Sequence, residues 1–222
     1  MLKKERTMCT LKRIDDLAND INENGYENCI NEIERFSEDQ DLFVRSELAV
    51  VLADFINDHS IMILSKLLCD RSYLVQVEAI DSLMGVDNEE IKEKVKHCMN
   101  SKHPLVRGYA YIFMSLAADN TKEQLDAFSL LNEKNVWARI KLLTGMSQLG
   151  DEGSIQTLLK MYRKCNYLNR CAIANGFADF FDDYSETGKR RIQSYFASYK
   201  NPNIGVAENE AVERVKEVCL IE

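Results

Sequence analysis

Hydrophobic residues recur along this chain at the spacing of one helix face, and the segments that carry them repeat. Five segments align at steps of about 31 residues, with one extra residue between the third and the fourth: LFVRSELAVVLADF (42–55), YLVQVEAIDSLMGV (73–86), PLVRGYAYIFMSLA (104–117), VWARIKLLTGMSQL (136–149) and YLNRCAIANGFADF (167–180). Four apolar columns run through the alignment five, four and three residues apart. In the first segment they are Phe43, Leu48, Leu52 and Phe55. This spacing predicts one apolar face of a helix rather than the alternation of a strand.

A second set of apolar segments lies between these blocks and predicts helices at 30–36, 61–69, 91–99, 123–131, 155–163 and 191–199. Polar turns before several of them supply helix caps. Each unit is therefore a helix A, a turn and a helix B. Because one helix pair cannot cover its own apolar faces, neighbouring pairs must stack. The pattern predicts an all-α solenoid.

We expect the solenoid to form a single domain over residues 1–222. Residues 1–38 would be N-terminal capping helices, including one near 8–21. Residues 39–200 would hold the repeats, and residues 201–222 would form a C-terminal cap with a helix near 206–219.

A short motif recurs at the turn into helix B: an acidic residue, then Val-Arg. DQDLFVRSELA (39–49) has Asp39, Val44 and Arg45. The later copies keep parts of the motif. The second has Asp70 and Val75 but Gln76 in place of Arg, and the third has Val106 and Arg107 but Ser101 in place of the acid. The last two copies keep only the arginine, Arg139 and Arg170. Over roughly residues 25–200 the chain resembles HEAT repeats of the short bacterial, PBS-lyase-like type. That resemblance implies a right-handed α-solenoid of about six helix pairs, in which the arginines and turn acids form a hydrogen-bonded ladder between units. The fold serves many unrelated functions.

The composition narrows the class of partner. The 222 residues carry a net charge of −8, which disfavours binding to nucleic-acid phosphates and favours a basic protein. Its seven cysteines are scattered without a Cys-x-x-Cys pair, as is typical of reduced thiols in a cytoplasmic protein. No stretch of about 18 apolar residues predicts a membrane span. We expect a cytoplasmic protein that is monomeric on its own.

The sequence offers little catalytic chemistry. Cys69, His97, Cys98 and His103 match no zinc spacing, so we expect no metal and no cofactor. Neither a nucleophile–base pair nor a phosphate-binding glycine loop is evident. Trp137 falls in the first apolar column, which predicts core packing. Some HEAT-like DNA glycosylases use aromatic residues with an aspartate. Here the residue four positions after Trp137 is Lys141 and not an acid. A DNA glycosylase or a bilin lyase-type protein stays the alternative to a non-enzymatic protein.

Two surfaces remain as candidates. A basic cluster (Lys160, Arg163, Lys164, Lys189, Arg190, Arg191) is either a solvated face or a site for an anion or an acidic partner. On the B helices, which line the concave side of HEAT solenoids, the positions outside the apolar columns should face outward. They are Glu47, Val50, Asp54, Glu78, Asp81, Tyr109, Ile112, Lys141, Thr144, Gln148, Asn175 and Asp179. We expect this face to bind a basic protein, with the acids steering the encounter and the apolar centre anchoring it. A more specific version of this hypothesis is an immunity protein that neutralises a bacterial toxin.

Overall fold

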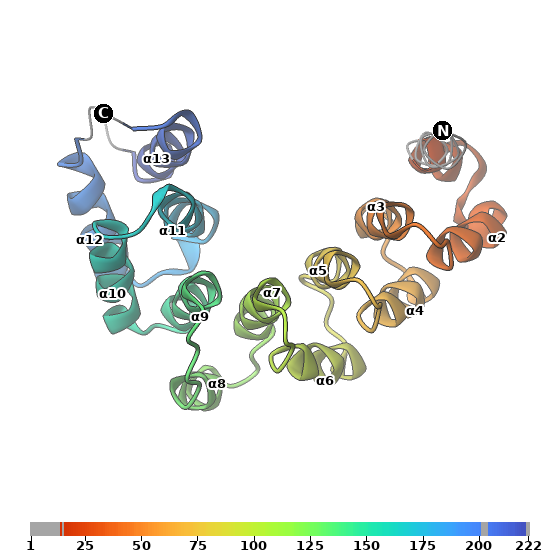
Figure 1. Cartoon of the computed structure of the whole chain (residues 1–222), viewed down its shortest axis with the longest axis horizontal. Helices are drawn as coiled ribbons and strands as arrows, with labels where there is room; N and C mark the ends of the chain where they lie inside the picture. The colour runs from red at the N-terminus through yellow and green to blue at the C-terminus, as the bar shows by residue number, and fades with distance from the viewer. Residues whose placement is uncertain (1–13, 15, 201–203, 221–222) are drawn as a thin grey trace. The chain divides into compact units, whose positions relative to one another are not determined.

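The computed structural model describes residue 14, residues 16–200 and residues 204–220, and the regular elements of that part are all helices. Residues 16–24 are helical. The further helices are α2 (Tyr26–Ser37), α3 (Leu42–Ala53), α4 (Asp58–Leu67), α5 (Tyr73–Ser82), α6 (Glu89–Cys98), α7 (Pro104–Leu116), α8 (Thr121–Ser129), α9 (Val136–Gln148), α10 (Glu152–Tyr162), α11 (Tyr167–Asp179), η1 (Phe181–Asp183), α12 (Glu186–Ala197) and α13 (Val206–Val218). Figure 1 shows them along the chain. Both sets of predicted helices are present, so the all-α prediction is confirmed.

The chain packs as two compact units, Met1–Phe113 and Met114–Glu222. Of the helix predicted near 8–21, residues 8–13 and 15 lie outside the described residues, and the helical segment continues to residue 24. Over the described part of the chain, no helix combines the length and apolar character needed to cross a membrane.

Short polar side chains start most of these helices. Asn88, Asn120 and Asp151 each accept a hydrogen bond from a backbone N–H in the first turn that follows, as the polar turns predict. At α4 the cap is Asn57, and Ser60 hydrogen bonds back to the Asn57 backbone to complete a capping box. The turns therefore set where each helix begins.

In the B helices, the first buried residue lies one position later in the sequence than the first predicted apolar column. In α3 the buried residues Val44, Leu48 and Leu52 are spaced four apart, whereas Phe43 is 58% exposed. Five residues turn a helix by about 140° beyond a full turn, so Phe43 faces away from Leu48. Leu168, in the same predicted column, is 71% exposed, and Trp137 is only partly buried. The prediction that this column packs in the core is wrong. The Val of the Val-Arg motif takes its place, for example Val75 in α5.

The arginine of the motif links neighbouring helix pairs. Arg45 is 4% exposed, and its Nε and Nη2 donate to the two carboxylate oxygens of Asp70 at 2.7 and 2.8 Å. Its Nη1 donates to the Asp39 carbonyl at 2.6 Å. In the next pair Gln76 reaches only the Asp70 carbonyl, at 2.6 Å, because its amide is too short to span to another unit. One arginine and one turn acid, Arg45 and Asp70, therefore link two neighbouring helix pairs.

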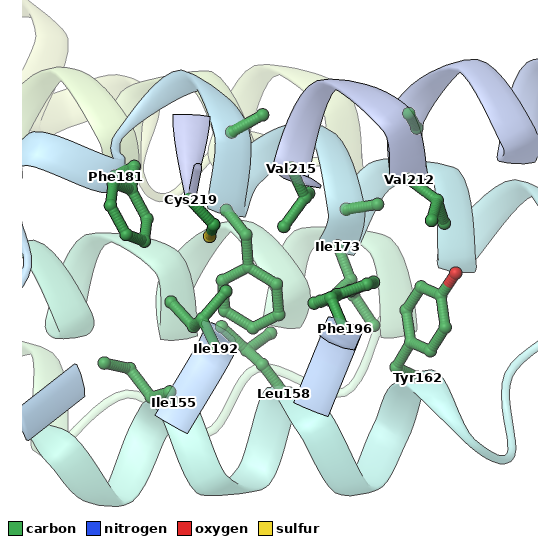
Figure 2. Close-up of a cluster of buried hydrophobic side chains, with 14 of the residues drawn as sticks. Ile155, Leu158, Tyr162, Ile173, Phe181, Ile192, Phe196, Val212, Val215 and Cys219 are labelled. Carbon is green, nitrogen blue, oxygen red and sulfur yellow. The ribbon is translucent and has the colours of Figure 1, made fainter. Parts of the chain in front are cut away.

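The core of the second unit is rich in aromatic residues (Figure 2). Leu158 and Tyr162 of α10 meet Phe177 of α11 and Phe196 of α12 in one cluster. The Tyr162 and Phe196 rings lie edge to face with centroids 5.4 Å apart, and Phe177 and Phe196 do so at 6.1 Å. Val215 of α13 completes the cluster, so the last helix is part of the core.

One charged group is fully buried in this unit. Glu208 of α13 is 0% exposed and accepts from Nε and Nη2 of Arg170, both at 2.8 Å. It also accepts from the hydroxyls of Tyr162 and Tyr199 at 3.1 and 3.0 Å. Burial opposes ionisation of Glu208, but these hydrogen bonds outweigh it and hold the pKa of the carboxyl below its usual range. Glu208 therefore links α13 to α10, to α11 and to the end of α12.

Candidate functional site

Three of the predicted site residues come together on α3 and α5, which lie side by side in the first unit (Figure 1). Glu47 is on α3, and Glu78 and Asp81 are on α5. Burial raises the pKa of Glu78, and the negative charges of Asp81 and Glu47 raise it further. Such an effect requires the carboxylates to be close in space. The register of the repeat, which puts Glu47 and Glu78 31 residues apart, explains why they meet.

The negative charge of this group is only partly balanced. Among the described residues, Glu47, Glu78 and Asp54 have no Lys, Arg or His nitrogen within 4.0 Å. Asp54 is exposed at the C-terminal end of α3, where the helix dipole is negative and a carboxylate is unfavourable. The dipole of α3 therefore does not favour the negative charge of Asp54.

Exposed apolar residues lie on the same stripe of α3. Phe43, Glu47, Val50 and Asp54 follow one another at spacings of four, three and four residues, which keeps them within about 60° on the helix. Phe43 is 58% and Val50 is 44% exposed. Phe43 was missed as a surface residue because it was assigned to the core. Its position four residues before Glu47 is the signal that could have found it.

The predicted outward face does not continue unchanged through the later B helices. On α7, Tyr109 is partly buried and Ile112 is only 2% exposed, so the prediction of an exposed apolar centre at Ile112 is wrong. On α9, Thr144 is 1% exposed, and its hydroxyl donates to the Ile140 carbonyl at 2.9 Å. A Cβ built on Gly176 would lie 3.2 Å from the Thr144 hydroxyl oxygen, which indicates that α11 approaches α9 too closely for Thr144 to face solvent.

The remaining predicted residues of α9 and α11 are engaged within the second unit. Lys141 Nζ lies 5.6 Å from the ring centroid of Trp137, a cation–π contact. Gln148 accepts from the Ser115 hydroxyl at 2.7 Å.

The C-terminal helix engages the last two predicted residues. Arg214 of α13 donates to Asn175 at 2.8 Å and to Asp179 at 2.6 Å. Helix α13 thus occupies polar groups that the sequence pattern assigns to a partner.

The histidine and cysteine residues considered as metal ligands are placed in other roles. The His103 ring stacks on Tyr73 with centroids 3.5 Å apart, and His97 is exposed. Burial and the neighbouring Cys69 raise the pKa of Cys98 to about 11, whereas a metal-binding cysteine is a thiolate. Within residues 14, 16–200 and 204–220, no three His, Cys, Asp or Glu side chains are grouped closely enough to hold a metal ion.

Comparison with known proteins does not assign this chain to a family. No protein-family model matches the chain, and a search of curated proteins finds no significant match.

Proposed function

We propose that this protein is a non-enzymatic scaffold that binds a basic segment of another protein through α3 and α5. The binding surface, called here the acidic surface, consists of Phe43, Glu47, Val50, Asp54, Glu78 and Asp81. The observation that carries the proposal is the packing of α3 against α5, which brings Glu47 toward Glu78 and Asp81 beside the exposed Phe43 and Val50.

The free protein holds these carboxylates at a cost. Like charges at short distance repel one another, and burial of Glu78 adds a desolvation penalty. A Lys or Arg side chain from a partner would reduce the repulsion and offset the desolvation penalty of Glu78 upon binding. The surface is therefore complementary to a cation that the described part of the chain does not supply to Glu47 or Glu78.

The apolar residues define the rest of the partner. Phe43 and Val50 alternate with the acids along α3 and leave apolar area exposed to water. Burial of apolar side chains at the centre of an interface supplies most of its affinity, and charges around them supply specificity and speed of association. The expected ligand is a segment with Lys or Arg on either side of an aliphatic or aromatic residue.

The wider architecture belongs to the same proposal. We infer a right-handed α-solenoid of about six HEAT-like helix pairs in one domain. Two links support stacking of successive pairs: Arg45 with Asp70, and Arg170 with Glu208. A specific form of the function is an immunity protein that covers the basic active site or nucleic-acid groove of a bacterial toxin. The net charge of −8 supports that form.

The test compares two charge-neutralised variants of the full chain. Glu47→Gln with Glu78→Gln removes two acids of the acidic surface, and Glu23→Gln with Glu27→Gln removes two exposed acids elsewhere. The probe is a fluorescent peptide with Lys on either side of a Leu. We expect the first variant to lose about tenfold in affinity and the second to change less than about twofold. Equal losses would refute the proposal, as would tighter binding of a DNA duplex than of the peptide.

Binding should also be linked to protons. The pKa of Glu78 is raised in the free protein, and a cation bound beside it favours the charged form. Peptide binding near pH 5 should therefore release protons. Calorimetry in buffers of different ionisation enthalpy measures that release, and we expect it to be lost in the Glu47→Gln, Glu78→Gln variant. Proton uptake upon binding would contradict the assignment.

A further inference from the structure

A groove lies between α10 and α12 in the second unit. These two helices are the A helices of their pairs. It has a volume of about 470 Å³. Its lining contains four basic residues, an aromatic ring and aliphatic carbon, and it contains no acid. The lining residues are Gln156, Leu159, Lys160, Arg163, Thr187, Arg190, Arg191, Ser194 and Tyr195.

Helical spacing brings the basic residues together. Lys160 and Arg163 are three residues apart at the end of α10, and Arg190 and Arg191 precede Ser194 and Tyr195 by one turn on α12. The sequence cluster divides accordingly, because Lys164 and Lys189 do not line the groove.

The positive charge of the groove is largely unbalanced. Arg191 lies 3.5 Å from Glu152. Among the described residues, Lys160, Arg163 and Arg190 have no carboxylate within 4.0 Å. Three of the four cations thus lack an acidic neighbour in a chain whose overall charge is negative.

An aromatic residue, Tyr195, forms part of one wall of the groove. The guanidinium carbon of Arg163 lies 5.1 Å from the Tyr195 ring centroid. Tyr195 in turn contacts Tyr162 edge to face, at 5.9 Å between centroids, and Tyr162 is buried in the core. These contacts favour one orientation of Arg163 and of the Tyr195 ring in the free protein. A pre-oriented site loses less entropy when it binds.

We propose that this groove binds an acidic peptide segment of a second protein. Its Asp or Glu residues would pair with Lys160, Arg163 and Arg190, and an aliphatic or aromatic residue between them would pack on Leu159 and Tyr195. The groove is far larger than a single phosphate or sulfate needs. Its apolar wall suits a ligand that alternates charge with hydrophobic groups, which an acidic peptide does and an inorganic anion does not. The four cations of the groove match the few carboxylates of a short peptide, whereas a nucleic acid brings a continuous row of phosphates.

This site is independent of the acidic surface. It lies in the other unit, carries the opposite charge and requires the opposite ligand. Failure of one proposal leaves the other standing, since the basic peptide tests the first unit and an acidic peptide tests the second.

The experiment titrates the full chain with a fluorescent peptide of about 12 residues that carries Glu at alternate positions and two Leu. The test variant is Lys160→Glu with Arg190→Glu. The matched control is Lys164→Glu with Lys200→Glu, which changes the net charge equally at exposed positions outside the groove. At low salt we expect the test variant to weaken binding at least about tenfold and the control to change it less than about threefold.

A second variant guards against misfolding of the first. Ser194 is exposed in the groove, so Ser194→Glu adds one carboxylate there without removing a side-chain contact of Lys160 or Arg190. We expect this variant to keep the wild-type helical circular dichroism and to bind the peptide several-fold more weakly. Equal losses in the test and control variants would overturn the proposal, because net charge alone would then explain binding. Tighter binding of a single-stranded oligonucleotide of equal charge would overturn it as well.

Discussion

The buried contact between Glu208 and Arg170 offers the sharpest test of the fold. It joins α13 to α11, and a second ion pair, Arg214 with Asp179, joins the same two helices at the surface. Glu208 is 0% exposed and Arg170 is 25% exposed, whereas Arg214 and Asp179 are 51% and 39% exposed. Two substitutions that each remove one negative charge, Glu208→Gln and Asp179→Asn, therefore compare a buried and an exposed pair between the same elements.

The magnitudes follow from burial. Breaking a buried ion pair by removing one partner costs about 3–5 kcal/mol. Arg170 keeps its hydrogen bond to the Cys165 carbonyl at 2.7 Å and is partly reached by water, so we expect about 2–3 kcal/mol for Glu208→Gln. An exposed pair contributes about 0–1 kcal/mol, so Asp179→Asn should cost less than about 1 kcal/mol.

The assay is urea unfolding of the full chain, followed by circular dichroism and by fluorescence of Trp137, which lies in the second unit and is the only tryptophan. A change in the midpoint at constant slope reports the loss of stability. Equal destabilisation by the two substitutions would refute the argument that burial decides the strength of these pairs. A Glu208→Leu, Arg170→Met variant checks the cause, because it leaves no unpaired charge. It also leaves the hydroxyls of Tyr162 and Tyr199 without the Glu208 acceptor, so it should recover part of the loss and not all of it.

The same pair predicts how stability depends on pH. The pKa of Glu208 is lowered in the folded state, so the unfolded state binds more protons between the folded pKa and about 4.3, the usual value for Glu. The stabilisation is therefore fully present above about pH 4.3 and is lost as the pH falls through the folded pKa. The difference in unfolding free energy between wild type and Glu208→Gln should narrow as the pH falls from 6 toward about 3. A difference that stays constant over this range would contradict the assignment.

Three further predictions concern the first unit and the thiols. Arg45→Lys should cost about 2 kcal/mol in urea unfolding, because lysine lacks the planar fork that donates in parallel to both Asp70 oxygens while also reaching the Asp39 carbonyl. Arg45→Met with Asp70→Leu should be more stable than Arg45→Met alone, because it leaves no unpaired charge; no loss in Arg45→Lys would contradict the role of the link. Asn57→Ala should lower the free energy of unfolding by about 1–2 kcal/mol, because it removes the α4 cap. Asn57→Ser should lower it by less than half as much, and equal losses would argue against capping. Iodoacetamide at pH 8 should modify exposed Cys69 at least about tenfold faster than Cys219, since burial raises the pKa of Cys219 to about 11. Peptide mass spectrometry measures both rates, and equal rates in the folded protein would contradict the burial of Cys219.

The repeat in the sequence determined the helices and much of their packing. Helix positions, caps and the buried Leu48 and Leu52 followed from local spacing, because a helix face is defined by residues three and four apart. The Arg45–Asp70 link matches what the resemblance to HEAT repeats implies for the arginine and the turn acid. The acidic surface was partly predictable for the same reason, since Glu47 and Glu78 occupy the same place in consecutive units.

Only the tertiary structure decided which faces stay open. Local spacing does not tell how closely the next helix approaches, so it assigned Phe43 to the core and Ile112 to the surface, and both are the reverse. It also assigned Asn175 and Asp179 to a partner, although Arg214 of α13 already engages them. The buried Glu208 and the groove between α10 and α12 depend on side chains that are brought together from different helices. A periodic pattern determines the direction of each side chain on its own helix, and the packing of neighbouring helices determines whether that direction leads to protein or to water.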